Sequence, residues 1–201
     1  GDNLRTAVLS EAQTQIAAAA AAALNWHSIA RHCERCGAGL EPAMGGFASF
    51  CRVCNRLIFP RTDPAIIVAV LDPDDRIFLA HQHSWPPGRV SVLAGYLEAG
   101  ESAENAVHRE VGEEARLTLS AVRYVASQPW TFPRSLMLGY VARGLGAGLV
   151  DGVELEWGSW YDRADLESQL DAGKVIIAAP GSIARRLIDA WRVRKLPTPE
   201  G

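Results

Sequence analysis

Three glutamates lie close together in one predicted helix, and their spacing suits a metal site. Glu110, Glu113 and Glu114 stand at positions i, i+3 and i+4, so a helix with about 3.6 residues per turn places them on one side. Carboxylates crowded in this way repel one another, and a hard divalent cation such as Mg²⁺ or Mn²⁺ relieves the repulsion. Because Mg²⁺ is usually shared with substrate phosphates, this face predicts a platform for phosphate chemistry. The alternative is a solvated acidic face, the usual role of a charge run.

The residues around the three glutamates favour the metal site. The string GYLEAGESAENAVHREVGEEARL, residues 95–117, resembles the Nudix box, G-x5-E-x7-R-E-U-x-E-E-x-G-U, where U is aliphatic. Every fixed position matches except Arg116, which stands where the family has glycine. That position follows the helix, where left-handed backbone geometry is common. We expect the arginine to cost about 1 kcal/mol if this geometry is kept.

All four cysteines of the chain occur in two CxxC pairs separated by fourteen residues. Two such pairs presented by tight turns predict a tetrahedral thiolate site for Zn²⁺, with Gly45-Gly46 at the tip of a hairpin between them. Two disulfides or unrelated buried thiols are the alternatives. A site closed by four thiolates has no open position, so we expect a role in folding. The predicted ligands are Cys33, Cys36, Cys51 and Cys54.

Size and composition set outer limits on the function. The chain has 201 residues, is 48% hydrophobic and carries a net charge of −3. It is long enough for one sizeable core and a small module, and its charge implies no general affinity for nucleic acids or membranes. No apolar run reaches the roughly 18 residues that a membrane span needs. No signal-peptide pattern is present, and we expect a cytoplasmic protein.

Three segments are expected along the chain. Residues 1–31 predict a helix through Leu4, Val8, Leu9 and the alanine run Ala17–Ala23. This helix is either the remnant of an N-terminal domain that precedes Gly1 or a linker that packs on the next segment of the chain. Residues 32–57 predict the zinc ribbon, and residues 58–201 predict the Nudix hydrolase domain. The resemblance implies an α/β fold, the Nudix α/β/α sandwich with a mixed central sheet.

Strands are expected at 65–71, 76–80, 90–93, 122–126 and 136–141, and helices at 165–170 and after the N-cap Ser182. His81 and His83 follow the second of these strands on alternate positions and could share a strand face. They could share a metal, but no third soft ligand lies near them in the sequence, and ordinary structural histidines are the favoured interpretation.

A loop between two predicted strands carries aromatic and polar groups. Trp130 and Phe132 offer flat faces, and two prolines stiffen the segment. Such a loop could clamp a base or a nicotinamide ring by stacking, or it could be an ordinary connection. Residues 127–135, SQPWTFPRS, resemble SQPWPFPxS of NADH pyrophosphatases of the NudC type, with Thr131 replacing the central proline. The resemblance implies substrate contacts by Gln128, Pro129, Trp130, Thr131, Phe132, Pro133, Arg134 and Ser135.

The resemblance also implies the chemistry, which is hydrolysis of a pyrophosphate bond by water. Two or three Mg²⁺ or Mn²⁺ ions would neutralise the diphosphate and acidify a bound water. We expect Glu114 to be the group most closely coupled to that water, with Arg109 orienting a neighbouring carboxylate and Glu101 in a supporting position. Glu156 is an alternative to Glu154 as the last of the metal ligands. The expected catalytic and metal-binding groups are Glu110, Glu113, Glu114, Glu154 and the carbonyl of Ala94.

The implied substrates are NAD(H), which would be cut to NMN(H) and AMP, and the NAD caps of RNA 5′ ends. Phe59 and Tyr96 match family positions that sandwich the nicotinamide from different subunits, so a homodimer is implied. A further substrate contact is implied near Ala184. Two other functions stay open at this point: hydrolysis of another nucleoside diphosphate derivative such as ADP-ribose, and a catalytically weakened zinc-ribbon protein that binds nucleic acid.

Overall fold

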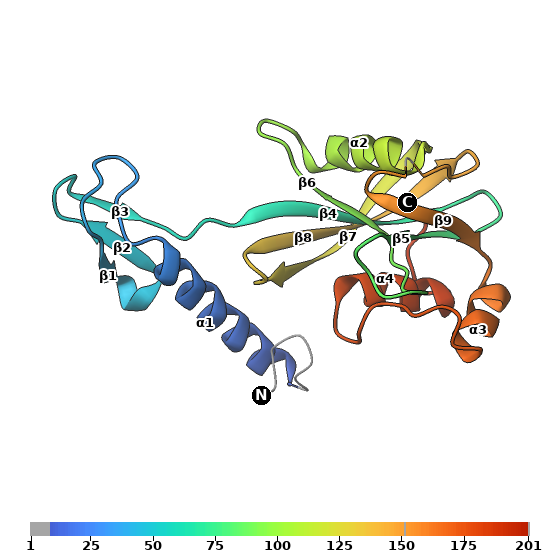
Figure 1. The fold of residues 1–201 in the computed structure, drawn as a ribbon, viewed down its shortest axis with the longest axis horizontal. Coiled ribbons are helices and arrows are strands. Elements are labelled where there is room, and N and C mark those ends of the chain that lie inside the picture. Colours follow the sequence, from blue (N-terminus) through green and yellow to red (C-terminus); the bar gives the residue numbers. More distant parts are fainter. Residues whose placement is uncertain (1–8, 151, 201) are drawn as a thin grey trace. The chain divides into compact units, whose positions relative to one another are not determined.

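A computed structural model describes residues 9–150 and 152–200, and the chain divides into two units (Figure 1). The first unit contains residues 1–63 together with 129–136, and the second contains residues 64–128 and 137–201. The domain boundaries expected at residues 31/32 and 57/58 stay predictions. No helix in the described part of the chain combines the length and the apolar character that crossing a bilayer requires.

The first unit contains one long helix and a small sheet. Helix α1 (Glu11–Ile29) begins with a capping box, in which the Ser10 side chain and the Gln13 side chain each bond the other's backbone amide. Of the segment predicted to be helical, Leu4 and Val8 lie outside the described residues. Strands β1 (Glu41–Ala43), β2 (Ala48–Cys51) and β3 (Arg56–Ile58) form an antiparallel sheet in that order, and the turn η1 (Met44–Gly46) links β1 to β2. Gly45 and Gly46 have positive φ there, as expected for the tip of a hairpin.

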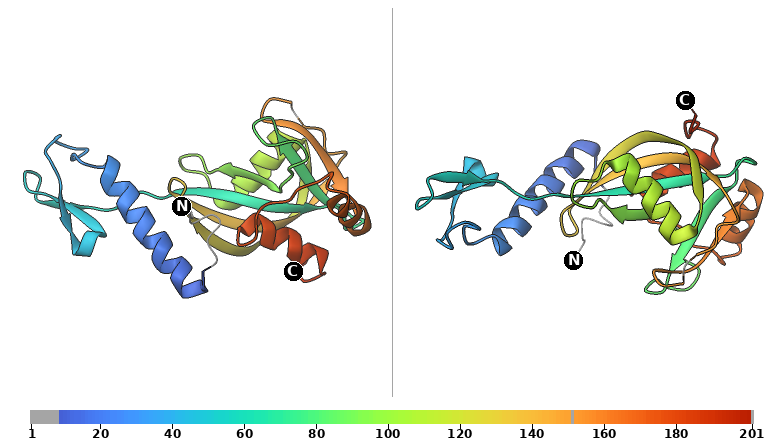
Figure 2. Two further views of the ribbon diagram at one scale, coloured as in Figure 1. Left: turned by 60° about the horizontal axis from the view of Figure 1, so that its bottom comes forward. Right: turned by 90° about the horizontal axis from the view of Figure 1, so that it is seen from above.

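The second unit is built on a mixed sheet of six strands in the order β7-β8-β4-β5-β9, with β6 paired to β4. Strand β4 runs antiparallel to both β5 and β6, and β5 runs antiparallel to β9. Helix α2 lies on one side of the sheet, and α3 and α4 lie on the other (Figures 1 and 2). The strands are β4 (Asp63–Leu71), β5 (Ile77–Gln82), β6 (Leu93–Tyr96), β7 (Thr118–Trp130), β8 (Ser135–Leu145) and β9 (Leu155–Tyr161); the helices are α2 (Ala103–Ala115), α3 (Arg163–Asp171) and α4 (Ile183–Arg192).

Strand β4 explains how one sheet carries helices on both faces. Successive side chains of a strand point to opposite faces. Ile66, Val68 and Val70 pack into the core beside α2, whereas Ile67, Ala69 and Leu71 pack into the core beside α3 and α4. A strand buried on both faces reads as a continuous apolar run, which is the pattern that predicted it. The α/β/α sandwich expected from the sequence is confirmed.

Several predicted strands differ from the observed ones. The strand expected at 90–93 begins only at Leu93 and continues to Tyr96, because Val90 donates its amide to Ile176 and Ser91 pairs with Ala80. Strands β7 and β8 are longer than the expected 122–126 and 136–141. The predicted loop therefore shrinks to a turn at residues 131–134, and residues 128–130 belong to β7. Strand β9 was missed, and it contains a register shift next to Glu156.

Candidate active site

Helix α2 holds the predicted carboxylates. The Ser102 side chain accepts a hydrogen bond from the Asn105 amide at the start of the helix, and Ala106, Val107 and Val111 are buried against the sheet. The helix ends at Arg116 in the left-handed conformation, with φ 52°. Its amide donates to the Gly112 carbonyl at 3.1 Å. The geometry that usually takes glycine is thus kept with an arginine in place.

Strand β6 brings a glycine against the first of these carboxylates. A Cβ atom built on Gly95 would overlap the carboxylate of Glu110, so this backbone and that side chain lie in direct contact. The side chain of Glu110 is only 12% exposed. Glycine is required here because of the close approach, a reason that the spacing of the motif does not reveal.

Arg109 connects the carboxylates to one another. Its Nε and Nη2 atoms each donate to a different oxygen of Glu101 at 2.9 Å, and Nη2 also donates to the Tyr96 carbonyl at 2.9 Å. Its Nη1 lies 2.9 Å from Glu110 Oε1 and 3.2 Å from Glu113 Oε2. The arginine therefore orients two of the predicted metal ligands and not only one, and it fixes the backbone beside Tyr96.

The pKa values follow from these contacts. Hydrogen bonds from Arg109 are the main reason that the pKa of Glu101 is lowered to about 2, so this carboxylate is charged at neutral pH. Burial raises the pKa of Glu110, Arg109 opposes this effect, and the charges of Glu113 and Glu154 raise it further. Glu154 thus acts electrostatically on the α2 carboxylates although it lies far away in the sequence. A carboxylate whose charge is disfavoured by burial and by neighbouring carboxylates is the kind of donor that suits a hard divalent cation.

Glu114 faces a small pocket rather than open solvent. It is 4% exposed and shares with Ala94 a pocket of about 180 Å³. Ala94, whose carbonyl is a predicted ligand, and Glu114, the predicted water-coupled carboxylate, therefore line the same pocket. The lining residues are Ile67, Ala80, Gln82, Trp85, Ser91, Val92, Leu93, Ala94, Glu114 and Leu155. Sequence reasoning did not single out Gln82 or Trp85.

The β9 register shift separates the two competing glutamates. His81 pairs with Trp157 and Gln82 pairs with Leu155, so Glu156 is an extra residue between two pairs. A carboxylate oxygen of Glu156 lies 3.4 Å from His81 Nε2 and 3.8 Å from His83 Nδ1. His81 itself is buried, donates from Nδ1 to the Arg89 carbonyl at 2.6 Å and stacks on Trp157. Glu156 thus lies beside the two histidines, whereas the charge of Glu154 acts on Glu110.

The residues predicted for substrate binding fall into two groups. In the first unit, Trp130 and Phe132 meet edge to face with centroids 5.4 Å apart, and Arg134 bonds Asp63 at 2.7 Å. A second pocket, of about 300 Å³, lies here. It is lined by α1 residues, residues 60–62 and Pro129, Thr131, Pro133, Arg134, Ser135 and Leu136.

In the second unit, the Gln128 side chain forms hydrogen bonds at the start of α4. It donates to the Gly181 carbonyl and accepts from the Ile183 amide, each at 2.7 Å. Ala184, in the first turn of α4, is buried. The two predicted stacking rings are exposed on their own units, Phe59 by 55% and Tyr96 by 56%.

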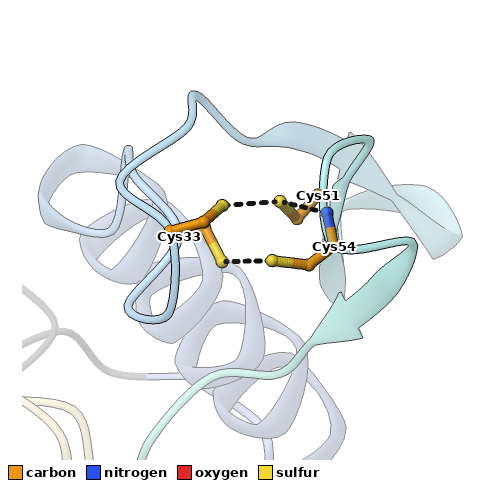
Figure 3. Close-up of side chains that lie close together, drawn as sticks. Cys33, Cys51 and Cys54 are labelled. Atoms are coloured by element: carbon orange, nitrogen blue, oxygen red, sulfur yellow. Dashed lines mark hydrogen bonds between the residues drawn. The ribbon is translucent and has the colours of Figure 1, made fainter.

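The four cysteines come together as predicted. They are not disulfide-bonded, and their sulfur atoms all lie within 4.8 Å of one another. The Cys33 and Cys54 sulfurs are 3.9 Å apart (Figure 3), and those of Cys36 and Cys51 are 3.6 Å apart. Tetrahedral zinc with Zn–S bonds of about 2.3 Å needs sulfurs about 3.8 Å apart. Hydrogen bonds from the Arg35 and Cys36 amides lower the pKa of Cys33 to about 6, whereas the hydrogen bond to Cys36 and burial raise the pKa of Cys54 to about 12. The cluster therefore fits a metal ion.

Comparisons with known proteins identify the family of this chain. The profile of the NUDIX domain matches residues 61–178. The NAD-capped RNA hydrolase NudC of Mycobacterium bovis is 40% identical over 195 residues, which are 92% of this chain and 62% of that protein. The human NAD-capped RNA hydrolase NUDT12 is 36% identical over 196 residues, 91% of this chain and 42% of that protein. This chain thus spans less than two thirds of the length of either relative.

Among solved structures, a NUDIX hydrolase from Nitrosomonas europaea superposes with a TM-score of 0.62 over 84% of this chain and 95% of that one, at 17% identity. This similarity shows the fold. The match of the domain profile covers more than half of the chain. The chain therefore belongs to the Nudix family, and within that family it is similar to hydrolases of the NudC type.

Proposed function

We propose that this protein hydrolyses the pyrophosphate bond of NAD(H), giving NMN(H) and AMP, and that it removes NAD caps from RNA 5′ ends. The observation that carries the proposal is the cluster of glutamates and Arg109 on and beside helix α2. Glu110 rests on Gly95, Arg109 ties Glu101, Glu110 and Glu113 together, and Glu114 shares a pocket with Ala94. The names of the two relatives, which are both NAD-capped RNA hydrolases, support capped RNA as a substrate.

Glu110, Glu113, Glu114, Glu154 and the Ala94 carbonyl offer the oxygen donors that Mg²⁺ and Mn²⁺ prefer, and they are the groups that would hold these ions. When bound, such ions neutralise a diphosphate and acidify a water molecule. Glu114 accepts a proton from the attacking water inside its enclosed pocket. Arg109 keeps the other carboxylates in position before substrate arrives. The tight packing of Glu110 on Gly95 limits its rotamers.

The nicotinamide half would lie against Tyr96, whose backbone carbonyl is held by Arg109 at 2.9 Å. We place Phe59 of a second copy on the other side of the ring, so that the active unit is a homodimer. The exposed faces of both rings support this arrangement. Zinc at Cys33, Cys36, Cys51 and Cys54 would stabilise the unit that carries Phe59.

Chromatographic analysis of the products tests the proposal. NADH, NAD⁺, ADP-ribose and an NAD-capped RNA are incubated separately with the Mn²⁺- or Mg²⁺-loaded protein, with Glu114→Gln as the control variant. We expect NMN(H) and AMP from NAD(H), release of the cap from the RNA, and a loss of at least about 100-fold in the variant.

Cleavage of ADP-ribose without cleavage of NAD(H) or capped RNA would replace the proposal with hydrolysis of another nucleoside diphosphate derivative. A folded, zinc-loaded protein that cleaves none of the four substrates would reject the hydrolase function.

A further inference from the structure

We propose that His81, His83 and Glu156 form a further metal site, which binds Zn²⁺ or a similar transition-metal ion at the end of strand β5. In the sequence the two histidines have no third ligand near them, and ordinary structural roles are favoured. The fold brings a third ligand to them, because the bulge in β9 places Glu156 beside both rings. The inference is independent of the proposed function, in which these three residues take no part.

The two imidazole rings face the same carboxylate oxygen. Oε2 of Glu156 lies 3.4 Å from His81 Nε2 and 3.8 Å from His83 Nδ1. Ligands of a tetrahedral zinc ion with bonds of about 2.0–2.1 Å are about 3.3 Å apart, so the first distance fits. The second is longer, and among the described residues the four cysteines are the group whose ligand atoms already lie within 4.8 Å of one another. Binding therefore requires a movement of the His83 side chain, which is 53% exposed.

Each ring is oriented by a backbone carbonyl on the side away from Glu156. His81 Nδ1 lies 2.6 Å from the Arg89 carbonyl oxygen, and His83 Nε2 lies 3.1 Å from that of Gly152. A carbonyl oxygen only accepts hydrogen bonds, so the proton of each neutral ring belongs on the nitrogen that faces the carbonyl. The lone pair of the other nitrogen then faces Glu156. A metal-binding histidine almost always has its second nitrogen bonded in this way.

The three groups need a cation between them. An ionised carboxylate also only accepts hydrogen bonds, so two ring lone pairs and a carboxylate oxygen oppose one another unless a positive charge separates them. A proton on one ring bridges only that ring to Glu156, whereas a metal ion contacts all three donors. Two histidines and a glutamate are a known set of zinc ligands, and imidazole nitrogens suit Zn²⁺, Ni²⁺ and Cu²⁺ rather than Mg²⁺.

The site combines one fixed ligand with two adaptable ones. His81 is 4% exposed, stacks on Trp157 with ring centroids 5.3 Å apart and meets Trp85 edge to face. The side chains of His83 and Glu156 are 53% and 50% exposed. An ion therefore has a path from solvent to the site, and a water molecule can complete its coordination as the fourth ligand.

The site is separate from the glutamates of α2. Successive residues of β5 point to opposite faces of the sheet: Leu79 packs into the core beside α3 and α4, and Ala80 packs into the core beside α2. His81 follows the alternation of Leu79, so it lies on the face away from α2. The pocket beside Glu114 is lined by none of the three proposed ligands. A bound ion would join the end of β5 to the edge strand β9.

Calorimetric titration with Zn²⁺ tests the site. The full chain is loaded with zinc at the cysteines, dialysed to remove weakly held ions and kept in excess Mg²⁺, which occupies oxygen-donor sites. We expect one further equivalent of Zn²⁺ to bind. His83→Ala and Glu156→Gln should each weaken this binding by about 100-fold or more, because even the loss of an outer-shell partner costs about 10–100-fold. His108→Ala is the matched control, because it removes an exposed histidine of α2 that lies outside the site.

The ring nitrogens and the stability give two further measurements. In nitrogen-15-labelled protein, Zn²⁺ should shift the resonances of His81 Nε2 and His83 Nδ1 together, with saturation at one equivalent, and leave those of His108 unchanged. Zn²⁺ should also raise the unfolding temperature of the wild-type protein more than that of His83→Ala, because an ion that binds only the folded state stabilises it. The same unfolding curves check that each variant is folded.

The outcomes decide the proposal. A further equivalent of Zn²⁺ that is lost in His83→Ala and Glu156→Gln, and kept in His108→Ala, supports the site. If the folded wild-type protein binds no zinc beyond that at the cysteines, the site is overturned. Binding that all three variants retain also overturns it, because other groups would then hold the ion. Ring resonances that respond to pH but not to Zn²⁺ overturn it too, since the histidines would then be ordinary ion-pair partners of Glu156.

Discussion

The position of Glu110 depends on a residue without a side chain. Gly95 lies on β6, and the carboxylate of Glu110 occupies the space that a Cβ atom would need. A methyl group there has no room unless the carboxylate moves. Since positions of groups in an active site matter on the scale of about 1 Å, this contact gives the first testable consequence.

Gly95→Ala should reduce kcat for NAD(H) by about 100-fold, because the methyl group displaces Glu110 from the other carboxylates. Gly112→Ala is the matched control. Gly112 lies within α2, and a Cβ atom there meets nothing within 4 Å, so the change should retain activity and stabilise the helix by about 0.5–1 kcal/mol. Steady-state kinetics and urea unfolding of both variants measure these effects. Equal activity in the two variants would show that the Gly95 contact does not position Glu110.

Arg116 has a cost that a single substitution can remove. It is exposed and has φ 52° at the end of α2, a conformation that glycine adopts without strain. Arg116→Gly should raise the free energy of unfolding by about 0.5–1 kcal/mol with no change in kcat. Ser120→Gly, an exposed position inside β7, should instead lower it. Chemical denaturation of both variants tests the prediction, and a loss of stability in Arg116→Gly contradicts it.

Among the elements, helix α4 is bonded at its N-terminus by Gln128, a residue that we expected to contact the substrate. Both polar atoms of the Gln128 amide are bonded at the start of this helix, one to Gly181 and one to Ile183. Four amides at a helix N-terminus lack partners within the helix, and Gln128 satisfies one of them. Its side chain therefore joins β7 to α4.

Gln128→Ala should lower the free energy of unfolding by about 1–2 kcal/mol, because it leaves a helix amide and a carbonyl without these partners. Gln169→Ala removes a side-chain amide that donates to Asp165 one turn earlier in α3, and it should cost no more than about 0.5 kcal/mol. Urea denaturation distinguishes the two. Unchanged stability in Gln128→Ala together with a raised KM for NAD(H) would return this residue to the substrate-binding group.

We expect the small sheet of the first unit, β1 to β3, to depend on bound zinc for its stability. Each of its strands has three or four residues, which is little apolar surface for an independent core. Cys51→Ser should abolish zinc binding and make residues 32–58 sensitive to protease. The thermal unfolding transition of the second unit should remain. Elemental analysis and limited proteolysis measure both effects. Arg52→Ser changes the neighbouring exposed position and should retain the metal. An unchanged zinc content in Cys51→Ser would reject the cysteine site.

Sequence alone predicted most of these elements for identifiable reasons. Strand β4 and the carboxylate face of α2 follow from short-range periodicity, and the cysteine cluster follows from spacing. Strand β9 was missed because its alternation is broken by the bulge at Glu156. The contact of Gly95 with Glu110 and the bonds of Gln128 to α4 were not predicted, because each joins segments that are distant in the sequence. Local patterns contain no signal for such contacts.

At the scale of the whole molecule, the proposed homodimer makes a quantitative prediction. Glu114→Gln and Phe59→Ala should each be nearly inactive, because one lacks the proton acceptor and the other lacks the ring supplied to the partner's site. Mixed dimers would contain one intact site, with Glu114 from one copy and Phe59 from the other. After equal mixing and subunit exchange, activity should reach roughly a quarter of the wild-type value. Activity equal to the mean of the two variants would show that each site is completed within one copy.

Strand β4 has a consequence for how this protein can change in evolution. Because its alternate residues supply two different cores, the loss or gain of one residue would turn each set of side chains toward the wrong helices. A change of two residues would preserve the facing and alter only the length. Substitutions among apolar residues of similar volume should therefore be common in β4 across relatives, whereas single-residue insertions and deletions should be confined to the turns at 72–76 and 131–134, where the chain reverses without entering either core.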